Sequence, residues 1–233
     1  DRYSMRMNFD GNITSKLKMN LRLNGNVQKR NNHIRENNPI DYAYNTTRAL
    51  PVYNEDGSLY YYNNTPVSTG RTQDRFSYNI LNELENSSDT YNGSGMNANL
   101  DLRYTFSPEF DLSMGGTYTR NNTTQQLWWG DRTNYVAGLR NSEYGVLPPK
   151  GELGRSSLPY GGSIKNTNTV SDNFGFRLQS DFRKSFGSEK QHLITSTAGF
   201  EVHSTSSNSY ADEARGYIKE RGNKFINNVS DID

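Results

Sequence analysis

The sequence has 233 residues, a formal net charge of +1 from 26 basic and 25 acidic residues, and no cysteine. Hydrophobic residues make up only 32%, aromatic residues 12%, and the mean hydropathy is -0.94. The balanced charge argues against nucleic-acid binding, the absence of cysteine excludes disulfides and cysteine metal sites, and no apolar run reaches the ~18 residues of a transmembrane helix. Many aromatic and few aliphatic side chains favour β-structure with polar loops over helical bundles and α/β folds.

The N-terminal region alternates with period 2. From Tyr3 to Phe9, and again from Ile13 to Val27, the odd positions are mostly apolar and the even positions are polar. Successive side chains of a strand point to opposite faces, so each segment predicts a strand with one apolar and one polar face. Asp10-Gly11-Asn12 predicts a tight turn between the two strands.

The same unit returns twice along the chain. Met96 to Phe106 and Phe110 to Tyr118 alternate in this way, with a short turn between them. Phe174 to Phe186 and Ile194 to Val202 do the same around the turn Gly187-Ser188-Glu189-Lys190. The sequence therefore predicts an all-β, antiparallel meander of about six strands in three hairpins.

The connections between the hairpins are long. They run roughly from Gln28 to Gly95 and from Asn121 to Ser171, and a third begins near Ser204. Tight turns that alternate with long loops are typical of a transmembrane β-barrel, which has short periplasmic turns and long extracellular loops. Aromatic residues at the strand ends fit the interfaces of a membrane. The pattern favours part of such a barrel over a soluble antiparallel sheet with one wet face.

Shorter signals lie within the connections. Leu50 to Tyr62 predicts a small hairpin with its turn at Asp56-Gly57, and Ile80 to Leu84 predicts one helical turn. Trp128-Trp129-Gly130 comes before a run rich in glycine and proline from Gly145 to Gly162. We interpret these segments as structured outer loops.

The titratable side chains show no enzymatic signature. The histidines lack metal-binding spacing, and the neighbouring loop acids are expected to form turns or to be solvated. These residues are His33, His192, His203, Glu55, Asp56, Glu83 and Glu85. We expect that the chain is not an enzyme and that it binds no cofactor or metal.

Two sets of residues are candidates for a functional role. Aromatic residues of the loops could stack on sugar rings or anchor a protein interface, or could pack locally. They are Tyr60, Tyr61, Tyr62, Trp128 and Trp129. Charged residues at the polar positions of the strands could line a translocation path, or could pair across a barrel wall and with a plug. They are Lys16, Lys18, Arg22, Asp101, Arg103, Arg177, Asp181, Arg183 and Glu201.

Three segments of the sequence resemble a known family. Tyr42 to Ser58 resembles the first long barrel loop of SusC/RagA-type TonB-dependent transporters of Bacteroidetes. Phe76 to Ser87 is similar to a segment of that family built around the letters NEL, and Ile13 to Asn26 resembles one of its strands. These matches lie within residues 1–105, and the rest of the chain agrees in architecture.

The resemblance implies a plugged outer-membrane barrel of about 22 strands in contact with the lipid bilayer. It also implies a SusD-like surface lipoprotein as partner, energy from the TonB complex, and uptake of glycans or peptides. Residues 1–233 are then expected to be an internal barrel segment without the plug domain and the C-terminal strands. Two other hypotheses stay open: a soluble β-sandwich that binds carbohydrate, and a passive outer-membrane barrel or adhesin.

Overall fold

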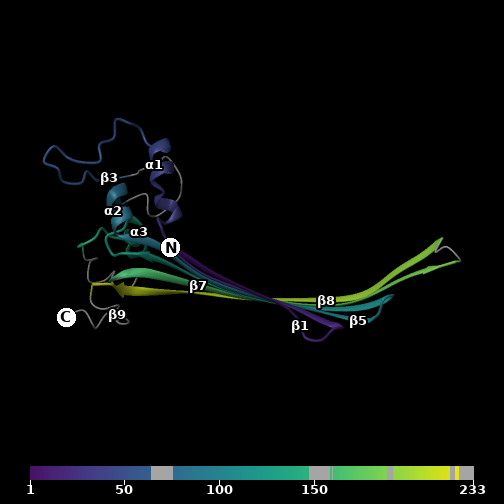
Figure 1. The fold of residues 1–233 in the computed structure, drawn as a ribbon. Coiled ribbons are helices and arrows are strands. Elements are labelled where there is room, and N and C mark those ends of the chain that lie inside the picture. The colour runs from purple at the N-terminus through teal and green to yellow at the C-terminus, as the bar shows by residue number, and fades with distance from the viewer. Residues whose placement is uncertain (64–75, 147–157, 159, 188–190, 221–223, 226–233) are drawn as a thin grey trace. The chain divides into compact units, whose positions relative to one another are not determined.

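The computed structural model describes residues 1–63, 76–146, 158, 160–187, 191–220 and 224–225. Six long strands form three hairpins (Figure 1). The strands are β1 Arg2–Asn12, β2 Leu17–Asn32, β5 Ser87–Ser107, β6 Phe110–Trp129, β7 Gly162–Phe186 and β8 His192–Ile218. Together with the short β9 (Lys224–Phe225) they make one sheet in the order β1-β2-β5-β6-β7-β8-β9. The predicted antiparallel meander is therefore confirmed.

Shorter elements lie in the first two connections. They are η1 Arg35–Asn37, α1 Pro39–Asn45, β3 Tyr62–Asn63, β4 Ser77–Tyr78, α2 Ile80–Glu85 and α3 Asn134–Arg140. Strands β3 and β4 pair in a two-stranded sheet of their own. The predicted small hairpin is present, because Tyr53 bridges to Leu59 and Gly57 takes a φ of 82° at the turn. The predicted helical turn is α2.

The chain divides into two compact units. Unit 1 consists of residues 1–29, 92–124 and 168–210, which include the turn-side halves of the three hairpins. Unit 2 consists of residues 30–91, 125–167 and 211–233, which include all three α-helices and the two-stranded sheet. Each unit is described separately below.

The register of β1 and β2 gives the sheet of unit 1 two different faces. Tyr3 lies opposite Val27, and Phe9 lies opposite Leu21. Between these pairs Asn8 lies opposite Arg22. Directly opposed residues of an antiparallel pair share a face, so the apolar positions of both strands lie together and the polar positions lie together on the other side.

The first turn differs from the prediction. Strand β1 runs through Asp10-Gly11-Asn12, and the turn is formed by residues 13–16. The Thr14 hydroxyl accepts hydrogen bonds from the backbone N–H groups of Lys16 and Leu17, which closes the turn. A hydroxyl that accepts such hydrogen bonds can close a turn without a glycine, so the turn need not lie at the nearest glycine. The prediction placed the turn at a glycine that the strand accommodates.

The strands are longer than the alternation indicated. Strand β6 continues to Trp129 and β8 continues to Ile218, although loops were predicted from Asn121 and from about Ser204. Asn, Thr, Ser and Gln are frequent on both sides of these extensions. The hydrophobic period of 2 therefore ends while the hydrogen-bonded ladder continues, and the connections are shorter than expected. The predicted turn residues 188–190 and most of the run from Gly145 to Gly162 lie outside the described residues.

Strand β7 begins where two backbones approach closely in unit 2. A Cβ on Gly162 would overlap the carbonyl oxygen of Trp129. Gly162→Ala should therefore lower the free energy of unfolding by about 1–3 kcal/mol through forced backbone displacement. Thermal unfolding of the full-length protein would measure this effect. Gly116→Ala is the control, since a Cβ there would meet nothing within 4 Å. An equal loss in both variants would contradict the close approach as the cause.

Candidate functional site

The apolar face of unit 1 is exposed. Tyr3, Met5 and Phe200 have exposed fractions of 72%, 64% and 62%. All hydrophobic residues that are buried in the described part of the chain belong to unit 2 instead. They are Ile34, Ile80, Trp129, Val136, Ala137, Leu158 and Ile164. A soluble sheet buries its apolar face against another layer, whereas unit 1 presents that face outward.

The opposite, polar face of unit 1 is connected by hydrogen bonds across the strands. Arg22 on β2 pairs with Asp101 on β5 at 3.3 Å. On β5, Asn97 accepts from Asn24 of β2 at 3.3 Å and donates to Thr119 of β6 at 2.6 Å. Polar side chains of three neighbouring strands therefore lie on one face, as the period of 2 predicts.

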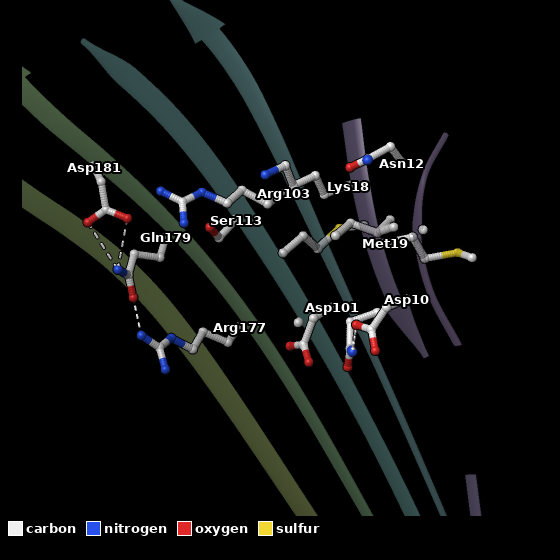
Figure 2. A pocket seen from close by; sticks show the side chains of 15 residues that line it. Asp10, Asn12, Lys18, Met19, Asp101, Arg103, Ser113, Arg177, Gln179 and Asp181 are labelled. Carbon is white, nitrogen blue, oxygen red and sulfur yellow. Dashed lines mark hydrogen bonds between the residues drawn. The ribbon is translucent and has the colours of Figure 1, made fainter. Parts of the chain in front are cut away.

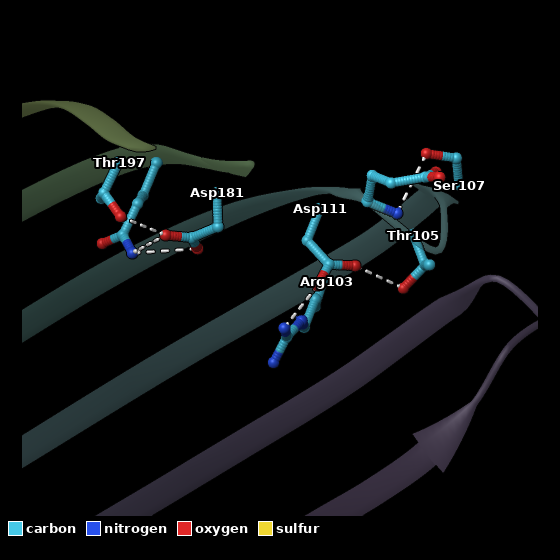
Figure 3. Close-up of polar contacts among 8 residues, drawn as sticks. Arg103, Thr105, Ser107, Asp111, Asp181 and Thr197 are labelled. Carbon is cyan, nitrogen blue, oxygen red and sulfur yellow. Dashed lines mark hydrogen bonds and ion pairs between the residues drawn. The ribbon is translucent and has the colours of Figure 1, made fainter. Parts of the chain in front are cut away.

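The same face continues to the third hairpin. Figure 3 shows Asp111 of β6 accepting from Arg103 at 2.6 Å and from Thr105 at 2.7 Å, both on β5. In the same view Asp181 of β7 accepts from Thr197 of β8 at 2.9 Å. In its ion pair with Asp111 the Arg103 side chain is 57% exposed, and ion pairs exposed in this way contribute little to stability. We interpret them as keeping long side chains in fixed positions on the polar face.

A hollow of about 640 Å³ lies on this polar face near the turns (Figure 2). Its charged and polar lining consists of Asp10, Asn12, Lys18, Asn20, Asp101, Arg103, Ser113, Arg177, Gln179 and Asp181. Basic and acidic side chains are equally represented, and Gln179 contacts both Arg177 and Asp181. Met19, Leu102 and Met114 also line the hollow, so it combines balanced charges with some apolar surface.

The predicted charged set falls mostly on this face. Lys18, Asp101, Arg103, Arg177 and Asp181 line the hollow, whereas Lys16 lies in the first turn, where its ammonium group donates to the Phe106 carbonyl at 3.4 Å. The remaining members lie on strands outside the hollow. They are Arg22, Arg183 and Glu201. Glu201 pairs with His203 at 2.7 Å, and both residues lie within β8.

Unit 2 contains a second cavity, which we call the loop pocket. Its volume is about 750 Å³. It is lined by Glu36, Asn37, Asp41, Tyr42, Asn45, Thr46, Thr47, Leu50, Tyr62, Tyr78, Glu83, Trp129, Asn134 and Tyr135. The ring centroids of Tyr42 and Tyr62 lie 6.1 and 5.7 Å from that of Tyr78. Trp129 stacks on Tyr135 with 4.5 Å between centroids. Two aromatic groups thus form the walls of a polar pocket.

Helix α2 holds the elements around the loop pocket together. Asn79 caps the helix, because its side-chain oxygen accepts from the N–H groups of Leu81 and Asn82 at 2.9 and 3.3 Å. Its amide nitrogen donates to the carbonyls of Val52 and Tyr60 in the small hairpin at 2.9 and 2.8 Å. An asparagine can satisfy helix and hairpin at once because its amide both donates and accepts.

Glu83 joins α2 to α3. Its carboxylate accepts from the backbone N–H of Asn134 at 2.9 Å and from the Asn82 amide at 3.2 Å. The side chain is only 1% exposed, so the expectation of a turn-forming or solvated acid was wrong for Glu83. The expectation holds for Asp56, which accepts from Ser58 in the small hairpin. Sequence spacing gave no sign of this difference, since burial depends on the distant helix α3.

Burial makes the stability of unit 2 depend on pH through Glu83. It raises the pKa of Glu83 from 4.5 to about 7, although the hydrogen bonds from Asn134 and Asn82 act in the opposite direction. A raised carboxyl pKa means that the folded state holds the proton more tightly than the unfolded state. The protonated Glu83 therefore stabilises the folded state; this stabilisation is complete below pH 4.5 and is lost as the pH rises to about 7.

We therefore expect the free energy of unfolding to fall by about 3 kcal/mol between these pH values, because each pKa unit is worth about 1.4 kcal/mol. Denaturant unfolding at a series of pH values, with a spectroscopic probe in unit 2, would measure the slope of the free energy of unfolding against pH. Glu83→Gln should abolish it. A slope that persists in this variant would assign the pH dependence to another group.

The predicted aromatic residues are separated by the fold. Tyr62 and Trp129 line the loop pocket, whereas Tyr60, Tyr61 and Trp128 do not. The Tyr61 hydroxyl donates to Asn82 at 3.3 Å, and Lys219 lies over the ring of Trp128 at 4.3 Å. The two tryptophans lie at the end of strand β6 and not in a loop.

Sequence reasoning missed several residues of the loop pocket. Tyr42 and Tyr78 belong to two of the three segments that carry the family resemblance, but neither was singled out as a binding residue. Glu36, Asp41 and Tyr135 gave no signal beyond lying in the connections. These residues come from three separate loop segments, and no local sequence pattern shows that the three segments lie together.

Two other properties bear on the class of protein. None of the helices in the described ranges is long and apolar enough to cross a membrane. Within the same residues no group of three or more His, Cys, Asp or Glu side chains is placed to hold a metal ion. The sheet, with one apolar and one polar face, remains the main structural feature on which a function can rest.

Comparison with known proteins confirms the resemblance to TonB-dependent transporters of the SusC/RagA type. The chain is 25% identical over 210 residues to TonB-dependent receptor P26 of Formosa agariphila, a match that covers 86% of this chain and 20% of that protein. No family model matches.

Solved structures show the same fold. The RagAB peptide importer in its open-open state matches with a TM-score of 0.66 at 15% identity, over 96% of this chain and 22% of that chain. The closed-closed state matches with a TM-score of 0.63 at 16% identity, over 91% and 21%. The chain thus spans about a fifth of the length of these relatives, and its meander corresponds to part of a TonB-dependent barrel.

Proposed function

We propose that this chain is a wall segment of an outer-membrane, TonB-dependent active importer. The observation that carries the proposal is the position of the hydrophobic side chains in unit 1, where the apolar face is exposed and the polar face is connected by hydrogen bonds. In a membrane barrel the apolar face contacts lipid and the polar face contacts water or a plug. The similarity to a TonB-dependent receptor supports the same assignment.

The rest of the proposed mechanism belongs to the whole protein. A solute would be held on the extracellular side by the loops and a SusD-like surface lipoprotein, and the TonB complex would then drive movement of a plug. The solute would be an oligosaccharide or a peptide; the name of the RagAB peptide importer supports the latter class. The polar face of unit 1, including the hollow, would form part of the wall around the plug. The chain itself would perform no catalysis.

Uptake in the source bacterium tests the proposal. Deletion of the gene should abolish uptake of labelled oligopeptides or oligosaccharides, and a protonophore should abolish uptake in the wild type. An affinity tag on the full-length protein should retain a surface lipoprotein in detergent. Uptake that resists the protonophore would support the passive barrel, and full recovery without detergent in the soluble fraction would support the carbohydrate-binding sandwich.

A further inference from the structure

We propose that the loop pocket binds a primary ammonium group of the imported solute. This inference rests on the proposed importer and specifies the chemistry of what it takes up. The pocket lies within one unit, its volume of about 750 Å³ is in the range of ligand sites, and its walls combine aromatic rings with acidic groups.

Two acidic side chains of the pocket, Glu36 and Asp41, could attract a cation. Glu36 and Asp41 are exposed at the pocket, and neither carboxylate takes part in an ion pair within the described part of the chain. No lysine or arginine belongs to the described lining. Arg215 lies near Tyr135 and pairs with Glu213 at 3.2 Å. Within the described ranges, the negative charges of Glu36 and Asp41 are therefore not used in an ion pair.

The aromatic groups provide a second attraction for the same kind of ligand. Burial raises the pKa of Tyr62 and Tyr78, so both phenols stay neutral at physiological pH. The Tyr62 hydroxyl also donates to the Tyr42 hydroxyl at 3.3 Å, which holds these two side chains together. A cation is attracted to the face of a neutral tyrosine ring, and more strongly where water is partly excluded. Tyrosine rings and the carboxylates of Glu36 and Asp41 line the same pocket, and this combination favours an ammonium group over a neutral amide.

A primary ammonium group can come from the lysine side chain of a peptide or from an amino sugar. Two pairs of probes separate these sources. The first pair is Gly-Gly-Lys-Gly-Gly with an acetylated N-terminus, in which the lysine carries the only primary ammonium group, and the same peptide acetylated also at the lysine Nε. The second pair is a glucosamine tetramer and its fully N-acetylated form. Acetylation removes the charge and leaves the rest of each probe in place.

Isothermal titration of the full-length protein in detergent would test the inference. We expect at least one charged probe to bind at least tenfold more tightly than its acetylated form. The double variant Glu36→Gln with Asp41→Asn should weaken that binding by about fivefold, as loss of partly exposed ion pairs does. Glu55→Gln is the matched control, because Glu55 is exposed in the small hairpin and does not line the pocket.

Asp41 lies in the first turn of α1, where a negative charge stabilises the helix. Glu36→Gln alone is therefore measured beside the double variant, with the melting temperature of each. Tighter binding of the lysine peptide would identify a peptide source, and tighter binding of the glucosamine tetramer would identify an amino sugar. Equal binding of charged and acetylated probes, no binding of any probe, or unchanged affinity in both acidic variants would overturn the inference. The protonophore-sensitive uptake assay would still decide the importer itself.

Discussion

Replacing Glu83 with alanine is expected to lower the free energy of unfolding of unit 2 by about 3 kcal/mol. The substitution removes the Glu83 acceptor of the Asn134 N–H and one of the two acceptors of the Asn82 amide, which also donates to the Arg132 carbonyl at 3.0 Å. A buried donor that loses its acceptor costs about 1–3 kcal/mol. Hydrogen exchange of the full-length protein should show the loss as faster exchange of the amides in α2 and α3. The amides of β1 and β2 in unit 1 should exchange at unchanged rates.

Glu83→Gln is the matched control for this substitution. Glutamine keeps a side-chain oxygen that can accept from Asn134, and it has the same length as glutamate. It should therefore leave α2 and α3 protected at pH 6. If glutamine opened the two helices as much as alanine does, the acceptor at position 83 would not be the group that joins them.

Replacing Leu100 with arginine is expected to prevent assembly of the full-length protein in the outer membrane. Leu100 lies on β5 among the exposed apolar side chains of unit 1. An arginine on the lipid face of a barrel costs about 2–4 kcal/mol at the middle of the bilayer and less near its surfaces. The amount of folded protein in the outer-membrane fraction, judged by resistance of the band to unfolding in SDS, measures the effect.

The neighbouring residue supplies the control. Asn99 lies one position away on β5, and its amide donates to Asn97 on the polar face. Asn99→Arg introduces the same side chain on the side that the account assigns to water, and it should assemble close to normally. Equal assembly of the two variants would mean that lipid does not contact the apolar face.

The alternation of side chains was enough to predict the fold of unit 1. Successive residues of a strand point to opposite faces, so the apolar and polar positions from Met96 to Phe106 already show which side chains share a face. The exact turn was missed because the Thr14 hydroxyl, and not the glycine at position 11, supplies its hydrogen bonds. The strand ends were missed because the extensions of β6 and β8 are polar on both faces.

The loop pocket could not be predicted in the same way. Asn79 and Glu83 lie in a string that resembles the family, but their role depends on contacts with a hairpin and a helix from separate parts of the chain. Trp129 was chosen for its ring, and the fold buries it against Tyr135. A pattern along the sequence reports local periodicity, whereas a cavity depends on which distant segments meet.

The central claim is that the two faces of the sheet in unit 1 contact lipid and water. Single cysteines along β5 from Met96 to Thr105 test it most directly, because residues 1–233 contain no cysteine that could compete for the label. Full-length variants would be reacted with a charged maleimide in outer-membrane preparations. The account predicts labelling that alternates with period 2, high at positions such as Asp101 and low at positions such as Leu100. Uniform labelling along the strand, or high labelling at the apolar positions, would contradict it.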